Sequence, residues 1–381
     1  MNRIKKILIA VAIFVVALVG LLYITGHDYL ITAVRTIYLN GHVTAFLDDY
    51  KYFENRTIPN GAPQPWAISK NYNKVEATET LETLHKKIGT VAFLVIKNDS
   101  IWHESYYDGY DKDSKSNSFS MAKSVVSAAL GKAIMEGKIS SLDQKVSDFF
   151  PQFKDGKAAK LTVGDLSSMA SGLNWDEDYY SPFSITTRSY FDPDLNKLIL
   201  GLKGIENPGE RYLYLSGNTQ LLAMVIEKAT NESLADYVAQ KFWQPLGAEH
   251  EAFWQTDKKD GIVKAYCCIA SNARDFARFG KLYANFGKWN GRQILDSAFV
   301  AKSIVARFPE SPQYGYGWWL FEHNGKKGFY MRGHLGQYTI VIPQENLIIV
   351  RLGKGRQVNT SGPHSKDFWV YLEEVDKMLA K

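Results

Sequence analysis

The chain has 381 residues, of which 45% are hydrophobic and 13% aromatic, and its formal net charge is +5. This composition excludes a disordered chain and supplies enough apolar surface for one large core or two smaller ones. Beyond the extreme N-terminus, lysine and arginine form no basic stripe, and no nucleic-acid motif is present. We therefore expect no nucleic acid as a partner.

The N-terminal segment predicts a membrane anchor. Arg3, Lys5 and Lys6 precede an uncharged apolar run over residues 7–24. As a helix this run is about 27 Å long, enough to cross a hydrocarbon core of about 30 Å, and the basic flank should stay in the cytoplasm. A cleaved signal peptide is the alternative, although the run is long for one and lacks a small-residue cleavage site. We expect residues 1–26 to form a single-pass anchor in the cell membrane, with the rest on the periplasmic or extracytoplasmic side.

Between the anchor and the body, residues 27–75 predict a short helix followed by an irregular connector with several Pro and Gly residues. The body is expected from about residue 76. It should begin with a short helix over Glu79–Lys87, followed by a β-hairpin with strands Thr90–Lys97 and Ile101–Tyr107.

The next element is an apolar helix that begins with Ser120-Met121-Ala122-Lys123. Nearly every position from 121 to 134 is apolar or small, which predicts a helix buried on most faces and a buried Lys123. Residues three apart share a helix face, so the Lys123 amine can reach the Ser120 hydroxyl. Burial lowers the pKa of a lysine, and a neutral amine beside a hydroxyl is a general base beside a nucleophile. The alternative is a capping serine and a lysine whose amine reaches solvent, because Ser-x-x-Lys alone is a weak motif.

A mostly helical and loop region follows over about 140–265, with its clearest helix at Thr219–Ala229. The last part of the chain is rich in β-strands and ends in a helix over Lys366–Leu379. Strands early and late, with helices between, predict an α/β (α+β) fold in which both ends of the chain build one antiparallel sheet around a helical insert. The late strands are expected over Tyr316–Phe321, Gly328–Arg332, Tyr338–Pro343 and Leu347–Leu352.

The two cysteines, Cys267 and Cys268, are adjacent. Adjacent cysteines do not reach ordinary disulfide geometry without strain, and no His or Cys lies at metal-ligand spacing around them. We therefore expect two buried thiols and a body that folds without disulfides, with neither metal nor cofactor.

Three motifs occur in a fixed order along the body. Ser120-Met121-Ala122-Lys123 comes first, Tyr214-Leu215-Ser216 lies within the stretch 208–219, and His334-Leu335-Gly336-Gln337 comes last. This order resembles the serine β-lactamase and penicillin-binding-protein superfamily, and within it the esterase and 6-aminohexanoate-dimer (nylon-oligomer) hydrolase branch. The likeness covers roughly residues 80–381, so residues 76–381 are expected to form one β-lactamase-like catalytic domain.

The resemblance implies a role for each motif. Ser120 would be the acylated nucleophile, Lys123 its base or proton relay, and Tyr214 a phenol that passes a proton to the leaving group. The backbone N–H groups of Ser120 and Gln337 would form the oxyanion hole. A proton-accepting Tyr214 requires cationic neighbours that lower its pKa of about 10, and a core aromatic is the alternative for this residue.

The wall opposite the nucleophile is assigned in the same way. Gly336 would let the strand approach the substrate closely, and Tyr179 matches a tyrosine that closes over bound amide substrate. His334 stands where most relatives have the lysine that grips a substrate carboxylate, and a histidine is mostly neutral at pH 7. A structural histidine and a surface-loop aromatic are the alternatives for His334 and Tyr179.

Two further departures bear on the substrate. Ser216 stands where the family has an asparagine that contacts substrate, and no Glu-x-x-Leu-Asn segment supplies a deacylating carboxylate. Together with His334, these departures favour hydrolysis of small esters or amides over efficient turnover of β-lactams. With the anchor, the expected function is a membrane-anchored serine hydrolase, a carboxylesterase or amidase, that cleaves small ester or amide substrates through an acyl-enzyme. The alternatives are a D,D-peptidase or β-lactamase acting on peptidoglycan-type substrates, and a non-catalytic membrane-tethered binding or sensor module. The sequence indicates neither the natural substrate nor the oligomeric state.

Overall fold

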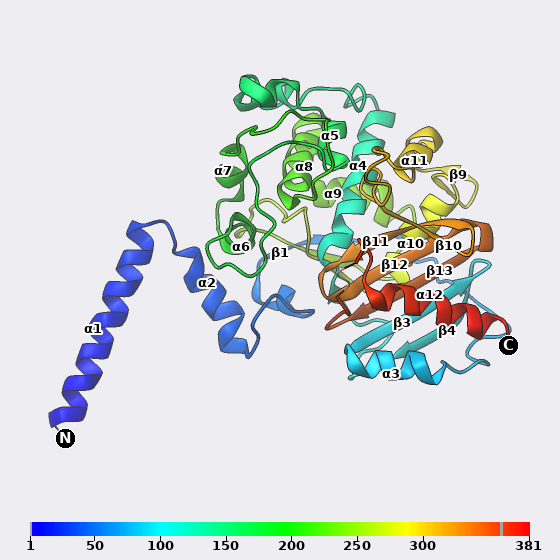
Figure 1. Cartoon of the computed structure of the whole chain (residues 1–381), viewed down its shortest axis with the longest axis horizontal. Helices are drawn as coiled ribbons and strands as arrows, with labels where there is room; N and C mark the ends of the chain where they lie inside the picture. Colours follow the sequence, from blue (N-terminus) through cyan, green and yellow to red (C-terminus); the bar gives the residue numbers. More distant parts are fainter. Residues whose placement is uncertain (1, 359–360) are drawn as a thin grey trace.

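A seven-stranded sheet is the centre of the computed structural model, which describes residues 2–358 and 361–381 (Figure 1). Its strand order is β10-β11-β12-β13-β3-β4-β2. The antiparallel pair of β13 and β3 joins the late part of the chain to the early part, which confirms the expected sheet built from both ends. The strands are β2 (Ala67–Ile68), β3 (Thr90–Lys97), β4 (Ser100–Tyr106), β10 (Trp319–His323), β11 (Lys326–Gly333), β12 (Gln337–Ile342) and β13 (Leu347–Gly353).

Alternating side chains divide the core into the two faces of this sheet. On β3, Phe93 and Val95 pack with α3 (Glu79–Lys87) and α12 (Lys366–Leu379), and both helices have the predicted bounds. Leu94 and Ile96 point to the other face, into the larger core that contains the helical region.

The helical region packs around two central helices, α4 (Ala122–Met135) and α8 (Ser216–Thr230). Both are buried over most of their length because their sequences are apolar on nearly all faces. The other helices of the body are α5 (Val163–Ser167), α6 (Ile185–Phe191), α7 (Leu195–Leu200), α9 (Leu234–Val238), α10 (Ala273–Ala284) and α11 (Ser297–Ser303), and a small hairpin joins β8 (Lys288–Trp289) to β9 (Arg292–Gln293).

The stretch 27–75 is more regular than its sequence suggests. After the expected short helix, α2 (Tyr29–Thr36), it supplies the parallel edge strand β2 to the main sheet, so this sheet is not wholly antiparallel. It also supplies β1 (Asn55–Ile58) to a second sheet with β6 (Ala252–Gln255), β7 (Ile269–Ser271) and β5 (Ser116–Asn117). Strands of two to four residues are too short to show an alternating pattern, which explains why the sequence did not reveal them.

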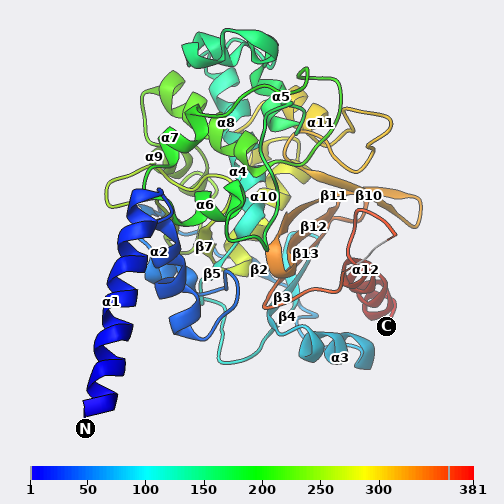
Figure 2. The ribbon, with the colours of Figure 1, turned by 60° about the vertical axis from the view of Figure 1, so that its left-hand side comes forward.

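The N-terminal helix α1 (Asn2–Ile24) extends away from the body (Figures 1 and 2). Within it, the segment Arg3–Ile24 is long and apolar enough to cross a membrane, a property that a signal sequence shares. The chain then turns into α2, which lies beside α6 (Figure 2).

The expectation of two free thiols is wrong, because Cys267 and Cys268 are joined by a disulfide. Both residues are buried, and Cys268 has a left-handed backbone with a φ of 76°. This local turn at the end of the helical insert has no signature in the sequence.

Candidate active site

Ser120 lies where the chain enters α4. It sits in the short 3₁₀ turn Phe119–Met121, directly before the helix. Lys123, one turn further on, donates from Nζ to Ser120 Oγ at 2.9 Å. The side chain of Lys123 is only 3% exposed, as the apolar pattern of α4 predicted, and its amine therefore does not reach solvent.

Three oxygen acceptors surround the Lys123 amine. Besides Ser120 Oγ, they are Ser216 Oγ at 3.0 Å and the backbone carbonyl of Tyr266 at 2.8 Å. Burial lowers the pKa of Lys123 to about 8, and the negative charge of Glu177 opposes part of this shift. A substantial fraction of the amine is then neutral near pH 8, so it can accept the proton of the Ser120 hydroxyl.

Glu177 is a part of this site that sequence analysis missed. Its carboxylate accepts hydrogen bonds from the Ser216 backbone at 2.7 Å, from Ser216 Oγ at 2.5 Å and from Trp175 Nε1 at 2.9 Å. Tyr179 also donates to it from its hydroxyl. Ser216 thus bridges the Lys123 amine and the Glu177 carboxylate. The acidic run 176–178 beside Tyr179 was the one sequence signal for this carboxylate. Because the run lies in a loop, no helix or strand periodicity indicated which of its side chains faces the site.

Tyr214 faces the same amine. Its ring centroid lies 5.0 Å from Lys123 Nζ, and its side chain is half-buried before the start of α8. Burial, together with the Glu177 charge, raises the pKa of Tyr214, although the Ser120 hydroxyl and two arginines, Arg332 and Arg356, oppose the shift. The lowered pKa that a proton-accepting tyrosine would require is therefore absent, and Tyr214 is a neutral phenol that can donate a proton.

His334 and Tyr179 form an aromatic wall beside the turn that contains Ser120. Their rings stack with centroids 5.5 Å apart, and the ring of Phe119 meets His334 edge-on at 5.6 Å. Burial lowers the pKa of His334 to about 4, and the charge of Arg356 adds to this effect. His334 is therefore neutral at pH 7. Tyr179 is 40% exposed, so the wall is open on that side.

His334 and Gly336 lie in a turn, whereas the resemblance implied a strand at this position. Residues 334–336 form a 3₁₀ turn between β11 and β12, with left-handed φ values of 60° at Leu335 and 80° at Gly336. A Cβ on Gly336 would lie 2.8 Å from Arg351 Nη1 and 3.1 Å from Arg356 Cβ, so this position requires glycine. The buried Gln337 side chain fastens the turn by donating to the carbonyls of His334 and Gly353.

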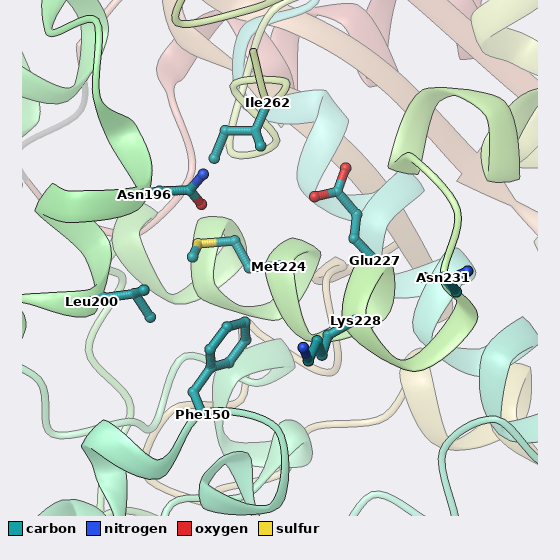
Figure 3. A pocket seen from close by; sticks show the side chains of 8 residues that line it. All are labelled: Phe150, Asn196, Leu200, Met224, Glu227, Lys228, Asn231 and Ile262. Carbon is teal, nitrogen blue, oxygen red and sulfur yellow. The ribbon is translucent and has the colours of Figure 1, made fainter. Parts of the chain in front are cut away.

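The fold thus brings Ser120, Lys123 and Tyr214 together and places the His334–Tyr179 wall beside them. A cavity of about 360 Å³ lies elsewhere, at the far end of α8, with Met224, Glu227 and Lys228 in its lining (Figure 3). It is roughly 12–18 Å along the helix from Ser216, so it is not part of this site. Among the described residues, no cluster of His, Cys, Asp and Glu could hold a metal ion.

Comparisons with known proteins agree with this geometry. The Beta-lactamase family model matches residues 75–369. The 6-aminohexanoate-dimer hydrolase of Paenarthrobacter ureafaciens is 25% identical over 319 residues, which are 77% of this chain and 80% of that protein.

The solved structures that share the fold include the following two. A penicillin-binding protein from Bacillus halodurans superposes with a TM-score of 0.61 at 16% identity, over 79% of this chain and all of that one. A family VIII carboxylesterase superposes with a TM-score of 0.63 at 16% identity, over 83% of this chain and 99% of that one. With the family match over most of its length, this chain belongs to the β-lactamase family and is a serine hydrolase.

Proposed function

We propose that this serine hydrolase cleaves small ester or amide substrates through an acyl-enzyme on Ser120. The 2.9 Å contact between Lys123 Nζ and Ser120 Oγ, inside a buried helix, is the observation that carries the proposal. A neutral amine at that distance can take the hydroxyl proton as Oγ attacks the substrate carbonyl.

The reaction then runs in two stages. Attack by Ser120 Oγ breaks the C=O π bond, and the backbone N–H groups of Ser120 and Gln337 stabilise the resulting oxyanion. The intermediate collapses, the C–O or C–N bond breaks, and the leaving group takes a proton from the Tyr214 phenol, which Lys123 reprotonates. In the second stage water attacks the acyl carbonyl and Lys123 accepts its proton. Ser120 Oγ then leaves and takes this proton from Lys123, which restores the neutral amine.

The His334–Tyr179 wall supports an uncharged substrate. His334 is neutral at pH 7 and stacks on Tyr179, so this side of the site offers aromatic surface in place of a fixed cation. The names of the similar 6-aminohexanoate-dimer hydrolase and of the carboxylesterase that shares the fold fit the same substrate class.

Arg356 favours a second candidate, a β-lactamase or D,D-peptidase that takes a carboxylate-bearing substrate. This guanidinium is only partly buried, and its charge acts on both His334 and Tyr214. Replacing Arg356 by Ala should lower kcat/KM for an anionic lactam and leave an uncharged ester unaffected if this candidate is correct.

The nucleophile is tested by Ser120→Ala. Hydrolysis of a p-nitrophenyl ester and labelling by a fluorophosphonate should fall by about 10³-fold or more, while the circular dichroism spectrum stays the same. Ser140→Ala, at an exposed position, is the matched control. Activity within about tenfold of wild type, or roughly 1.4 kcal/mol, would refute the assignment, and an unlabelled wild type would favour a binding or sensor module.

We also propose that α1 stays attached and holds the catalytic domain at the membrane, on the extracytoplasmic side. Its apolar, fully exposed span supports this role. The full-length protein should then resist carbonate extraction, and its body should be open to protease from the periplasmic side. A mature N-terminus near Gly26 or later would identify a cleaved signal peptide instead.

A further inference from the structure

The connector, residues 27–75, forms hydrogen bonds with Asn117, three residues before Ser120. Asp49 is completely buried, although it lies 26 residues before the start of the family match at residue 75. Its Oδ1 accepts hydrogen bonds from Asn117 Nδ2 and Gln255 Nε2, both at 2.8 Å, and its Oδ2 accepts one from the Tyr190 hydroxyl at 2.6 Å. Both carboxylate oxygens of Asp49 therefore have hydrogen-bond donors, and one of these bonds fixes the side chain of Asn117.

Asn117 in turn forms a hydrogen bond with Phe119, the residue before Ser120. Its own backbone N–H donates to the carbonyl of Leu47 in the connector at 2.8 Å, and its side-chain Oδ1 accepts the N–H of Phe119 at 2.8 Å. Phe119 has a φ of 46°, a left-handed conformation that is rare for a bulky side chain and persists only where its surroundings impose it. Ser120 is the next residue, so its direction depends on this turn.

The connector also packs over Lys264, the cation whose charge acts on Asp49. Burial raises the pKa of the Asp49 carboxyl, and the amine of Lys264 and the three hydrogen bonds oppose the shift. Lys264 Nζ lies 3.5 Å from the ring centroid of Phe53 in the connector and 4.8 Å from that of Tyr190. Asp49 and Phe53, four residues apart in the connector, thus both pack against the buried pair Tyr190 and Lys264.

We propose that Asp49 is a positioning residue for hydrolysis: it fixes Asn117, which holds Phe119 in its strained turn and so aims Ser120 at the substrate. This inference rests on the proposed function of Ser120. It extends the catalytic unit to a connector segment that lies outside the family match. Asp49 touches no reacting atom, so its effect should appear in the rate of acylation.

The test uses the full chain in detergent and follows labelling by a fluorophosphonate, with the rate constant and the final labelled fraction measured separately. Asp49→Ala should slow labelling by about 10- to 100-fold, the scale of a lost hydrogen bond to a charged group, and still reach full labelling. Asp49→Asn keeps the Oδ1 acceptor, and Tyr190 can accept from its amide, so the rate should stay within about threefold of wild type. Lys51→Ala, on the exposed side of the same turn, is the control.

A double substitution locates the effect. Asn117→Ala removes the same hydrogen bond from its other partner and should slow labelling to a similar degree, which decides the question if Asp49→Ala does not fold. Adding Asp49→Ala to Asn117→Ala should cause little further loss, because the two residues act in one chain of contacts. Independent, multiplying losses would overturn the inference.

Other outcomes separate this inference from the proposed function. Labelling of Asp49→Ala within twofold of wild type, or a lower final fraction that reacts at the wild-type rate, would overturn the positioning role alone. Failure of the wild type to be labelled at Ser120 would overturn the proposed function itself.

Discussion

The surroundings of Lys123 and of Lys264 differ, although both lysines are buried in the described part of the chain. Lys123 is 3% exposed and has three oxygen acceptors around Nζ. Lys264 is 1% exposed, and its Nζ has no hydrogen-bond partner among the described residues and lies over aromatic rings. Burial nevertheless lowers the pKa of both, to about 8 and about 7.

A lowered pKa therefore does not identify a catalytic lysine by itself. Desolvation acts on any buried amine, whereas proton transfer requires a hydroxyl within hydrogen-bond reach. Of these two lysines, only Lys123 has hydroxyls within reach, those of Ser120 and Ser216. Lys264 instead lies over the rings of Phe53 and Tyr190, and the charges of Asp49 and Asp257 oppose the lowering of its pKa.

The largest effect in this comparison is expected for Lys123→Ala. Removing the base from Ser120 should lower kcat/KM for a p-nitrophenyl ester by about 10³-fold or more, close to the effect of Ser120→Ala, because the two groups act as a unit. Lys138→Ala, an exposed lysine just after α4, is the control. A loss of less than tenfold would show that another group takes the Ser120 proton.

The second prediction concerns pH. With the neutral amine as the proposed base and a Lys123 pKa of about 8, kcat/KM for an uncharged ester should rise about 100-fold from pH 6 to above pH 8. The Glu177 charge raises this pKa, so Glu177→Gln should move the midpoint to lower pH. A profile that is flat, or a midpoint that moves upward in Glu177→Gln, would contradict the assignment of Lys123.

The third prediction extends the comparison to the His334–Tyr179 wall. His334→Lys places a cation where the wild type has a neutral ring, so acylation by an anionic lactam should improve relative to an uncharged ester. A charge contact in a cleft is worth about 1–3 kcal/mol, or roughly ten- to a hundredfold in the ratio of the two kcat/KM values. An unchanged ratio would mean that His334 does not select the substrate class.

The smallest effect is expected for Lys264→Met. Methionine is apolar and of similar length, and the three donors to Asp49 remain, so kcat/KM should stay within about threefold, less than 1 kcal/mol. The midpoint of the pH profile should not move. A fall in kcat/KM as large as that of Lys123→Ala would show that Lys264 is also needed for hydrolysis.

The local features of this protein could be predicted from its sequence. The three-residue spacing of Ser120 and Lys123 sets their contact, since one turn of a helix brings both side chains to the same face. The bounds of α3 and α12 agree with the sequence because hydrophobic periodicity is encoded within each segment, and the Thr78 side chain also caps α3. The late strands also follow the sequence, although β10 begins at Trp319, three residues after its expected start at Tyr316. The order of the motifs indicated the family.

Only the tertiary structure revealed the partners that these local features meet. Ser216 is 93 residues from Lys123, and Asp49 is 68 residues from Asn117, and no periodic pattern links such distant positions. Glu177 and Arg356 lie outside the helices and strands, where the backbone follows no regular repeat. The sequence thus determined the contact between Ser120 and Lys123 through short-range helix geometry, whereas the contacts of Glu177 with Ser216 and of Asp49 with Asn117 arise from the packing of distant segments.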